Sequence, residues 1–158
     1  MAELRKSAVR VQAMLDRFGL ALMVTEMKDS TRTAQEAADA VGCQVGQIAK
    51  SLVFRGKNSD EPLLVIASGA NRVNEKRLGE YAGEAVVKPD AEYVLAKTGY
   101  AIGGIPPVGH LQELKCLIDE DIFGYEEIWA AAGTPNAVFR LTPAQLLTIT
   151  GGQVVSVK

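Results

Sequence analysis

Residues that bind metals or form disulfides are scarce in this sequence. It contains one histidine, His110, and two cysteines, Cys43 and Cys116, which lie far apart. Zinc sites need three or four cysteine, histidine or carboxylate ligands at short, recognisable spacings, and the sequence has none of those spacings. We therefore expect no metal and no cofactor, and we expect both cysteines to be reduced residues that mainly pack in the fold.

Long apolar runs and an excess of positive charge are also missing. No stretch approaches the roughly 18 apolar residues that cross a bilayer, and residues 1–7 lack the apolar core of a signal peptide. We therefore expect a cytoplasmic protein with no membrane partner. The formal net charge of −2 argues against a broad basic face for long nucleic acid, but it leaves room for a small site that recognises one end. The cations between Arg32 and Arg77 are mixed with acidic residues, which is typical of an ordinary solvated surface.

The 158 residues match the size of one compact domain, and a hydrophobic content of 47% can supply its core. Ser7 is placed to cap a first helix, and Gly19 is placed to end it. Thr33 and Thr142 each begin a capping-box pattern at the start of a later helix. The predicted helices cover residues 7–19, 33–42, 74–81, 90–97 and 142–150, with a helical turn at 45–49.

Short runs rich in β-branched and aromatic residues lie between these helices. The predicted strands cover residues 20–24, 52–55, 63–67, 85–87, 116–119, 127–130, 138–141 and 154–157. A polar turn joins the second and third strands as a hairpin. Interleaved short strands and helices predict one α/β domain over residues 1–158, with a mixed, partly antiparallel sheet surrounded by short helices.

The sequence GGIPPVGH at residues 103–110 is the least ordinary stretch of the chain. Its glycines allow close approach of the backbone to a ligand, while Pro106 and Pro107 fix φ. Such a loop can direct rigid amides at a developing oxyanion, or a carbonyl at an ammonium group. On composition alone, a tight structural turn explains the loop better. The spacing matches neither a phosphate-binding P-loop nor a dinucleotide fingerprint.

Lys50 directly precedes the apolar run at residues 51–54, where a helical turn is expected to give way to a buried strand. In that position it can lean into a cleft as a fixed positive charge for a phosphate or an oxyanion, or it can be a surface residue. His110 is a candidate general base, and Ser51 or Ser68 a candidate nucleophile. These roles are weakly supported, because the sequence has no Gly-x-Ser-x-Gly elbow and a lone histidine is more often structural.

Three segments together resemble the YbaK/ProX family of aminoacyl-tRNA deacylases, which are related to the editing domain of bacterial prolyl-tRNA synthetases. They are TRTAQEAA at residues 31–38, GQIAKSLVF at 46–54 and GGIPPVGH at 103–110, in family order. The resemblance implies a YbaK-like, freestanding trans-editing hydrolase that removes a wrong amino acid from mischarged tRNA, typically tRNA(Pro). The implied partners are the acceptor end of aminoacyl-tRNA and, as a further candidate, prolyl-tRNA synthetase.

The resemblance also implies the site residues. Lys50 matches the lysine most closely tied to activity, and the loop matches the lining of the aminoacyl pocket. Because an aminoacyl ester is already activated, positioning, a placed water and oxyanion stabilisation can replace a strong nucleophile. The expected substrate-binding residues are Thr31, Arg32, Thr33, Ser51, Gly103, Gly104, Val108, Gly109 and His110, with Asn136 as a weaker candidate.

The loop differs from that of the cysteine-specific members of the family, which is more polar. This difference shifts the expected amino acid towards alanine or a slightly larger analogue and away from cysteine. Two other functions remain open: a non-catalytic module that binds a tRNA end or a synthetase, and a Schiff-base lysine enzyme. The Schiff-base enzyme is the weakest of the three, because the sequence offers no pyridoxal or carbonyl-substrate signature.

Overall fold

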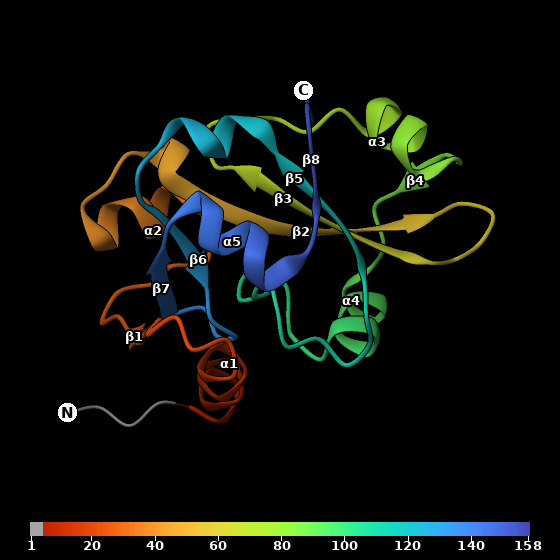
Figure 1. The fold of residues 1–158 in the computed structure, drawn as a ribbon. Coiled ribbons are helices and arrows are strands. Elements are labelled where there is room, and N and C mark those ends of the chain that lie inside the picture. The colour runs from red at the N-terminus through yellow and green to blue at the C-terminus, as the bar shows by residue number, and fades with distance from the viewer. Residues whose placement is uncertain (1–4) are drawn as a thin grey trace.

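The computed structural model describes residues 5–158, which form a mixed β-sheet with helices around it (Figure 1). The helices are α1 (Lys6–Asp16), α2 (Ala34–Val41), α3 (Glu75–Ala82), α4 (Ala91–Thr98) and α5 (Pro143–Thr150), with the 3₁₀ turns η1 (Val45–Gln47) and η2 (Glu120–Gly124). The strands are β1 (Val24–Glu26), β2 (Ile48–Gly56), β3 (Pro62–Ser68), β4 (Val86–Val87), β5 (Lys115–Asp119), β6 (Ile128–Ala131), β7 (Ala137–Leu141) and β8 (Gln153–Val155).

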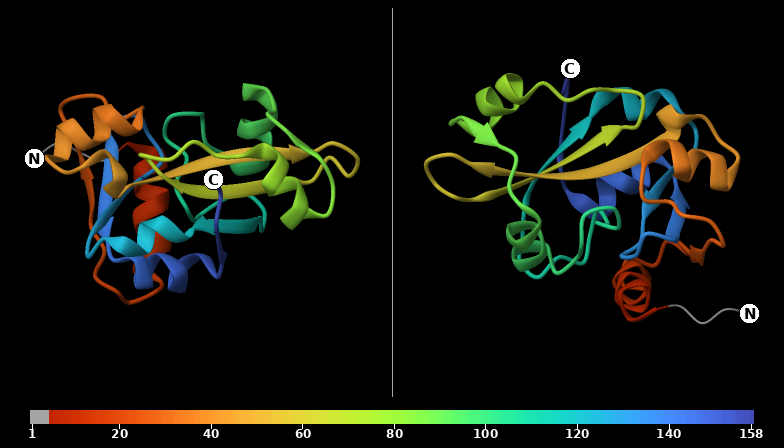
Figure 2. Two further views of the ribbon diagram at one scale, coloured as in Figure 1. Left: turned by 90° about the horizontal axis from the view of Figure 1, so that it is seen from above. Right: turned by 180° about the vertical axis from the view of Figure 1, so that it is seen from behind.

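The strand order is β1-β7-β6-β2-β3-β5-β8, and β4 pairs separately with β2. Strand β2 is antiparallel to β3 and parallel to β6, and β5 is parallel to both β3 and β8. The α/β class and the mixed, partly antiparallel sheet are therefore confirmed. The predicted β2–β3 hairpin is also confirmed, and Figure 2 shows it as a long ribbon that projects from one end of the sheet.

Apolar side chains cover both faces of the sheet. On one face, residues of α1, α4 and α5 pack against odd-numbered positions of β2, such as Ala49 and Val53. On the other face, Leu78 of α3 packs with Phe54 of β2. Because successive strand residues point to opposite faces, β2 contributes to both cores.

Residues 5–26 differ most from the prediction. Arg5, not Ser7, occupies the N-cap of α1, and the helix ends at Asp16 rather than near Gly19. Ala21 adopts a left-handed φ of 57°, which interrupts the strand predicted at residues 20–24. The side chain of Gln12 bonds the backbone of this segment to α1, and β1 begins only at Val24, where pairing with β7 starts.

Helix caps account for the better agreement elsewhere. The hydroxyl of Thr33 accepts the N–H of Glu36 at 3.1 Å, and Gly42 ends α2 with a left-handed φ of 76°. Thr142 and Gln145 form a reciprocal capping box at α5, with Pro143 at the first helical position. Strand β2 begins at Ile48, four residues earlier than predicted, so Lys50 lies inside a strand rather than at a junction with a helical turn.

Candidate active site

The site begins at a gap in the sheet beside β2. On this edge, β6 pairs with Ile48 and Ala49, and β4 pairs with Arg55 and Gly56. Among the described residues, no strand pairs with residues 50–54 on that side. The ladder of β2 is therefore open at the segment that contains Lys50.

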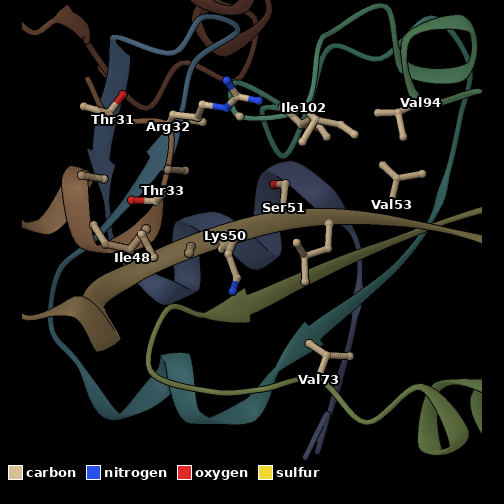
Figure 3. Close-up of a pocket in the computed structure, with 18 of the residues that line it drawn as sticks. Thr31, Arg32, Thr33, Ile48, Lys50, Ser51, Val53, Val73, Val94 and Ile102 are labelled. Carbon is tan, nitrogen blue, oxygen red and sulfur yellow. The ribbon is translucent and has the colours of Figure 1, made fainter. Parts of the chain in front are cut away.

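A cavity of about 850 Å³ lies at this gap (Figure 3). Its walls come from residues 31–34, which we call the entrance segment, and from β2 and β6. Residues 71–75 after β3 and residues 102–105 complete them. The predicted site residues on its lining are Thr31, Arg32, Thr33, Lys50, Ser51 and Gly103. The structure therefore brings these six residues to one cavity.

Lys50 and Ser51 point to opposite faces of β2 (Figure 3). This follows from strand geometry, in which adjacent side chains alternate. Lys50 shares its face with Leu52 and Phe54, whereas Ser51 shares the other face with Val53. The cavity reaches both faces because the neighbouring strand is missing at the gap.

The cavity is lined by more positive than negative charge. Its charged lining residues are Arg32, Lys50, Arg72 and Lys88, with Glu75 as the acidic one. The ion pairs between described residues involve other side chains, so none of these four cations is neutralised within residues 5–158. An anionic ligand would find unpaired charge here without breaking an internal salt bridge.

Ser51 carries a polar atom without a partner. Its Oγ is buried and makes no hydrogen bond within the described part of the chain. On this face the neighbouring lining residues Val53, Val94 and Ile105 are apolar. A buried hydroxyl of this kind is destabilising unless a bound molecule provides a partner.

The entrance segment is held against the turn at residues 133–136. The N–H and the hydroxyl of Thr31 both donate to the carbonyl of Pro135, at 2.6 and 3.0 Å. Asn136 donates its side-chain N–H to the carbonyl of Asp29 at 3.1 Å. Asn136 is not on the cavity lining, so in this structure it fixes the entrance rather than facing the cavity.

Most of the glycine-proline loop turns away from the cavity. Gly103 and Ile105 reach the lining, but Gly104, Val108, Gly109 and His110 do not. The carbonyl of Gly104 accepts the N–H of Gly133 at 2.8 Å, which joins the loop to the neighbouring turn. Val108 is buried in the core.

The far end of the loop is held by its own contacts. Tyr100 donates its hydroxyl to the carbonyl of Gly109 at 3.1 Å, and Nε2 of His110 lies 2.8 Å from the carbonyl of Pro106. Burial lowers the pKa of His110, and the hydrogen bond to Pro106 opposes this effect. These contacts show that His110 stabilises the loop from within. It does not line the cavity and is not positioned to act as a base there.

Two parts of the lining were not predicted from the sequence. Asn71 and Arg72, between β3 and α3, form one part of the lining, and Lys88, between β4 and α4, forms the other. Arg72 stands in a stretch of mixed charge, which suggested ordinary surface. Its position in the loop that follows the central strand β3 was the available signal, since loops at strand ends often build sites.

The described residues show no metal site and no membrane span. Within residues 5–158 no three metal-binding side chains of the histidine, cysteine or carboxylate type are grouped. No helix in the same range has the length and hydropathy to span a bilayer. Cys43 and Cys116 are free, and burial raises the pKa of the Cys116 thiol to about 12.

Most of the chain matches a known family of domains. The model of the aminoacyl-tRNA editing domain matches residues 28–149, which include the entrance, β2 and the glycine-proline loop. The chain belongs to this family. The resemblance inferred from the three motifs is thereby confirmed.

Individual relatives agree with this assignment. A solved structure of a candidate trans-editing enzyme for prolyl tRNA synthetase is 48% identical, covers 99% of both chains and has a TM-score of 0.92. YwhH of Bacillus subtilis is 32% identical over 123 residues, which is 78% of either chain. EbsC of Enterococcus faecalis, named as a candidate Cys-tRNA(Pro)/Cys-tRNA(Cys) deacylase, is 29% identical over 79% of this chain and 76% of EbsC.

Proposed function

We propose that this chain is a trans-editing hydrolase that cleaves the ester of mischarged aminoacyl-tRNA, with residues 1–158 acting as one domain. The observation that carries the proposal is the side chain of Lys50, which lies in the cavity at the open edge of β2 without an internal ion pair. The family and the trans-editing description of the 48% identical relative support the same reaction.

The lining residues suit an ester that is already activated. The cavity lining contains no histidine or cysteine, and Glu75 is its only carboxylate residue. A mechanism with a strong protein nucleophile is therefore poorly supported. In the proposed mechanism Lys50 holds the terminal phosphate or the developing oxyanion, and a group of the substrate helps to orient the attacking water.

The proposed substrate is tRNA(Pro) that carries a small wrong amino acid, alanine or a slightly larger analogue rather than cysteine. The apolar lining on the Ser51 face does not favour a strongly polar side chain. A methylene group changes binding in an apolar pocket by only ~1–3 kcal/mol, so a clash with the proline ring is the better explanation for sparing correctly charged tRNA. Prolyl-tRNA synthetase is the proposed protein partner.

A deacylation panel tests the proposal. Purified protein is incubated with tRNA(Pro) charged with alanine, cysteine, serine, 2-aminobutyrate or proline, and the remaining aminoacyl-tRNA is measured over time. We expect fastest loss of alanine or 2-aminobutyrate and retention of proline. Binding of the tRNA without hydrolysis of any ester would replace the enzyme by a non-catalytic tRNA-end module. Trapping of an adduct by borohydride would instead indicate Schiff-base chemistry.

A further inference from the structure

One wall of the cavity is an irregular segment between β3 and α3. Asn71, Arg72 and Val73 all line the cavity, and Asn74 caps the helix that follows. No strand pairing holds residues 71–74 in the described chain. The position of the Arg72 cation relative to Lys50 therefore depends on what fixes this segment from behind.

A buried carboxylate holds the start of the wall. Asp119, at the end of β5, is only 1% exposed. Its Oδ2 accepts the backbone N–H of Ser68 at 3.0 Å and the side-chain N–H of Asn71 at 2.8 Å, while its Oδ1 accepts the N–H of Asp121 at 2.9 Å. Three donors compensate for the burial of this charged group, as a structural carboxylate requires.

The last residues of the sequence hold both ends of the wall. The carbonyl of Val157, itself fully buried, accepts the N–H of Asn74 at 2.7 Å. Nζ of Lys158 lies 2.9 Å from Oδ2 of Asp121, and the same oxygen accepts the side-chain N–H of Asn71 at 2.8 Å. Figure 1 shows the C-terminal end beside the loop that leads into α3. We call residues 156–158 the strap segment.

The groups behind the wall do not belong to the cavity. Asp119, Asp121 and Lys158 are absent from its lining, and the strap segment lies beyond residues 28–149 that match the family. Asp121 responds to its neighbours, because the hydrogen bonds from Lys158 and then Asn71 lower its pKa. Any effect of these three side chains on a ligand in the cavity must pass through residues 71–74.

We propose that Asp119, Asp121 and Lys158 are positioning residues, which with the rest of the strap segment hold residues 71–74 so that Arg72 faces the bound nucleic-acid end. The consequence for tRNA rests on the proposed function. Because Arg72 brings a cation to the cavity lining, and under the proposed function Lys50 is the group assigned to the ester, loss of the network should raise KM and leave kcat nearly unchanged.

The test compares Asp121→Ala with Glu127→Ala. Both carboxylates are partly exposed, each forms one ion pair, and neither lines the cavity. For Asp121→Ala we expect faster hydrogen exchange at the Asn74 amide, a changed NMR signal of the Asn71 side-chain amide and a KM about 3- to 10-fold higher, since a small network contributes little more than single exposed pairs. Glu127→Ala should change none of these.

Two further variants separate positioning from general damage. Lys158→Ala should reproduce part of the exchange and KM effects, and Lys158→Arg should restore them because the cation is kept. Unchanged exchange in Asp121→Ala would overturn the proposal, and so would an equal fall in kcat. If the wild-type protein hydrolyses no ester, the proposed function and the KM effect fail, whereas the exchange data still decide whether the network holds the wall.

Discussion

Strand β2 and the glycine-proline loop contribute to the cavity in different ways. Along β2, consecutive residues from both faces line it, because the gap between β6 and β4 opens the edge of the strand. In the loop only Gly103 and Ile105 do so, whereas Gly104 is bonded to the turn at 133–136 and Gly109 to Tyr100. Under the proposed function, this difference assigns contact with the substrate mainly to β2 and support of the cavity mainly to the loop.

The largest expected effect is loss of activity on replacing Lys50. Lys50→Ala removes the unpaired cation of β2 and should lower kcat/KM for deacylation by about 100-fold or more, as removal of one electrostatic stabiliser does. The melting temperature should change little, because no ion pair or core contact is lost. Lys57→Ala, just beyond β2 and outside the cavity, is the control. Activity within 3-fold of wild type would contradict the role of β2.

A methyl group at Gly104 should instead damage the fold around the loop. An added Cβ would lie 2.8–3.0 Å from three backbone atoms of Thr134, which cannot move as a flexible side chain can. Gly104→Ala should lower the free energy of unfolding by about 1–3 kcal/mol, measured by chemical denaturation. Gly124→Ala, where nothing lies within 4 Å of the added Cβ, is the matched control. Equal stability of both variants would show that the loop is not braced by this turn.

The sequence predicted the fold where local signals and packing agree. Thr33, Thr142 and Gly151 define helix ends through their own caps, and the apolar hairpin β2–β3 forms as its composition indicates. The segment at 20–24 was assigned wrongly because side-chain bonds from Gln12 override its strand propensity. Such contacts between distant residues leave no periodic signal.

The same limit applies to the cavity. Motifs pointed to Lys50, Ser51 and the entrance segment, all of which line it. They could not show which loop residues face inward, since that depends on how the loop packs on the 133–136 turn. Nor could they show that Arg72 lines the same cavity, since the neighbouring residues Asn71 and Asn74 are bonded to Asp119 and to the strap segment, which are distant in the sequence.

The next expected effect is a change in stability on replacing Ser51, which lies on the face of β2 opposite to Lys50. Ser51→Ala removes a buried hydroxyl that has no hydrogen-bond partner, so the free energy of unfolding should rise by up to about 1 kcal/mol in urea denaturation. Ser68→Ala is the contrasting control, because the hydroxyl of Ser68 donates to the carbonyl of Gly46 at 2.8 Å and its loss should destabilise the fold. If both variants were destabilised equally, the hydroxyl of Ser51 would have a partner in solution.

The smallest effect is expected at His110, at the end of the loop. Burial places the pKa of His110 below its ordinary value of 6.5 in the folded state. Above pH 6.5 His110 is neutral in both the folded and the unfolded chain, and its contribution to stability is fully present. As the pH falls below 6.5, the unfolded chain binds a proton at His110 before the folded chain does. The free energy of unfolding therefore falls until the pH reaches the lower pKa of the folded state. His110→Gln should remove this component, while the carboxylates titrate alike in both proteins. The difference in free energy of unfolding between wild type and variant should therefore vary between pH 7.5 and 5.5. A constant difference would mean that burial does not shift the pKa of His110, and that this end of the loop is more exposed to solvent than its contacts indicate.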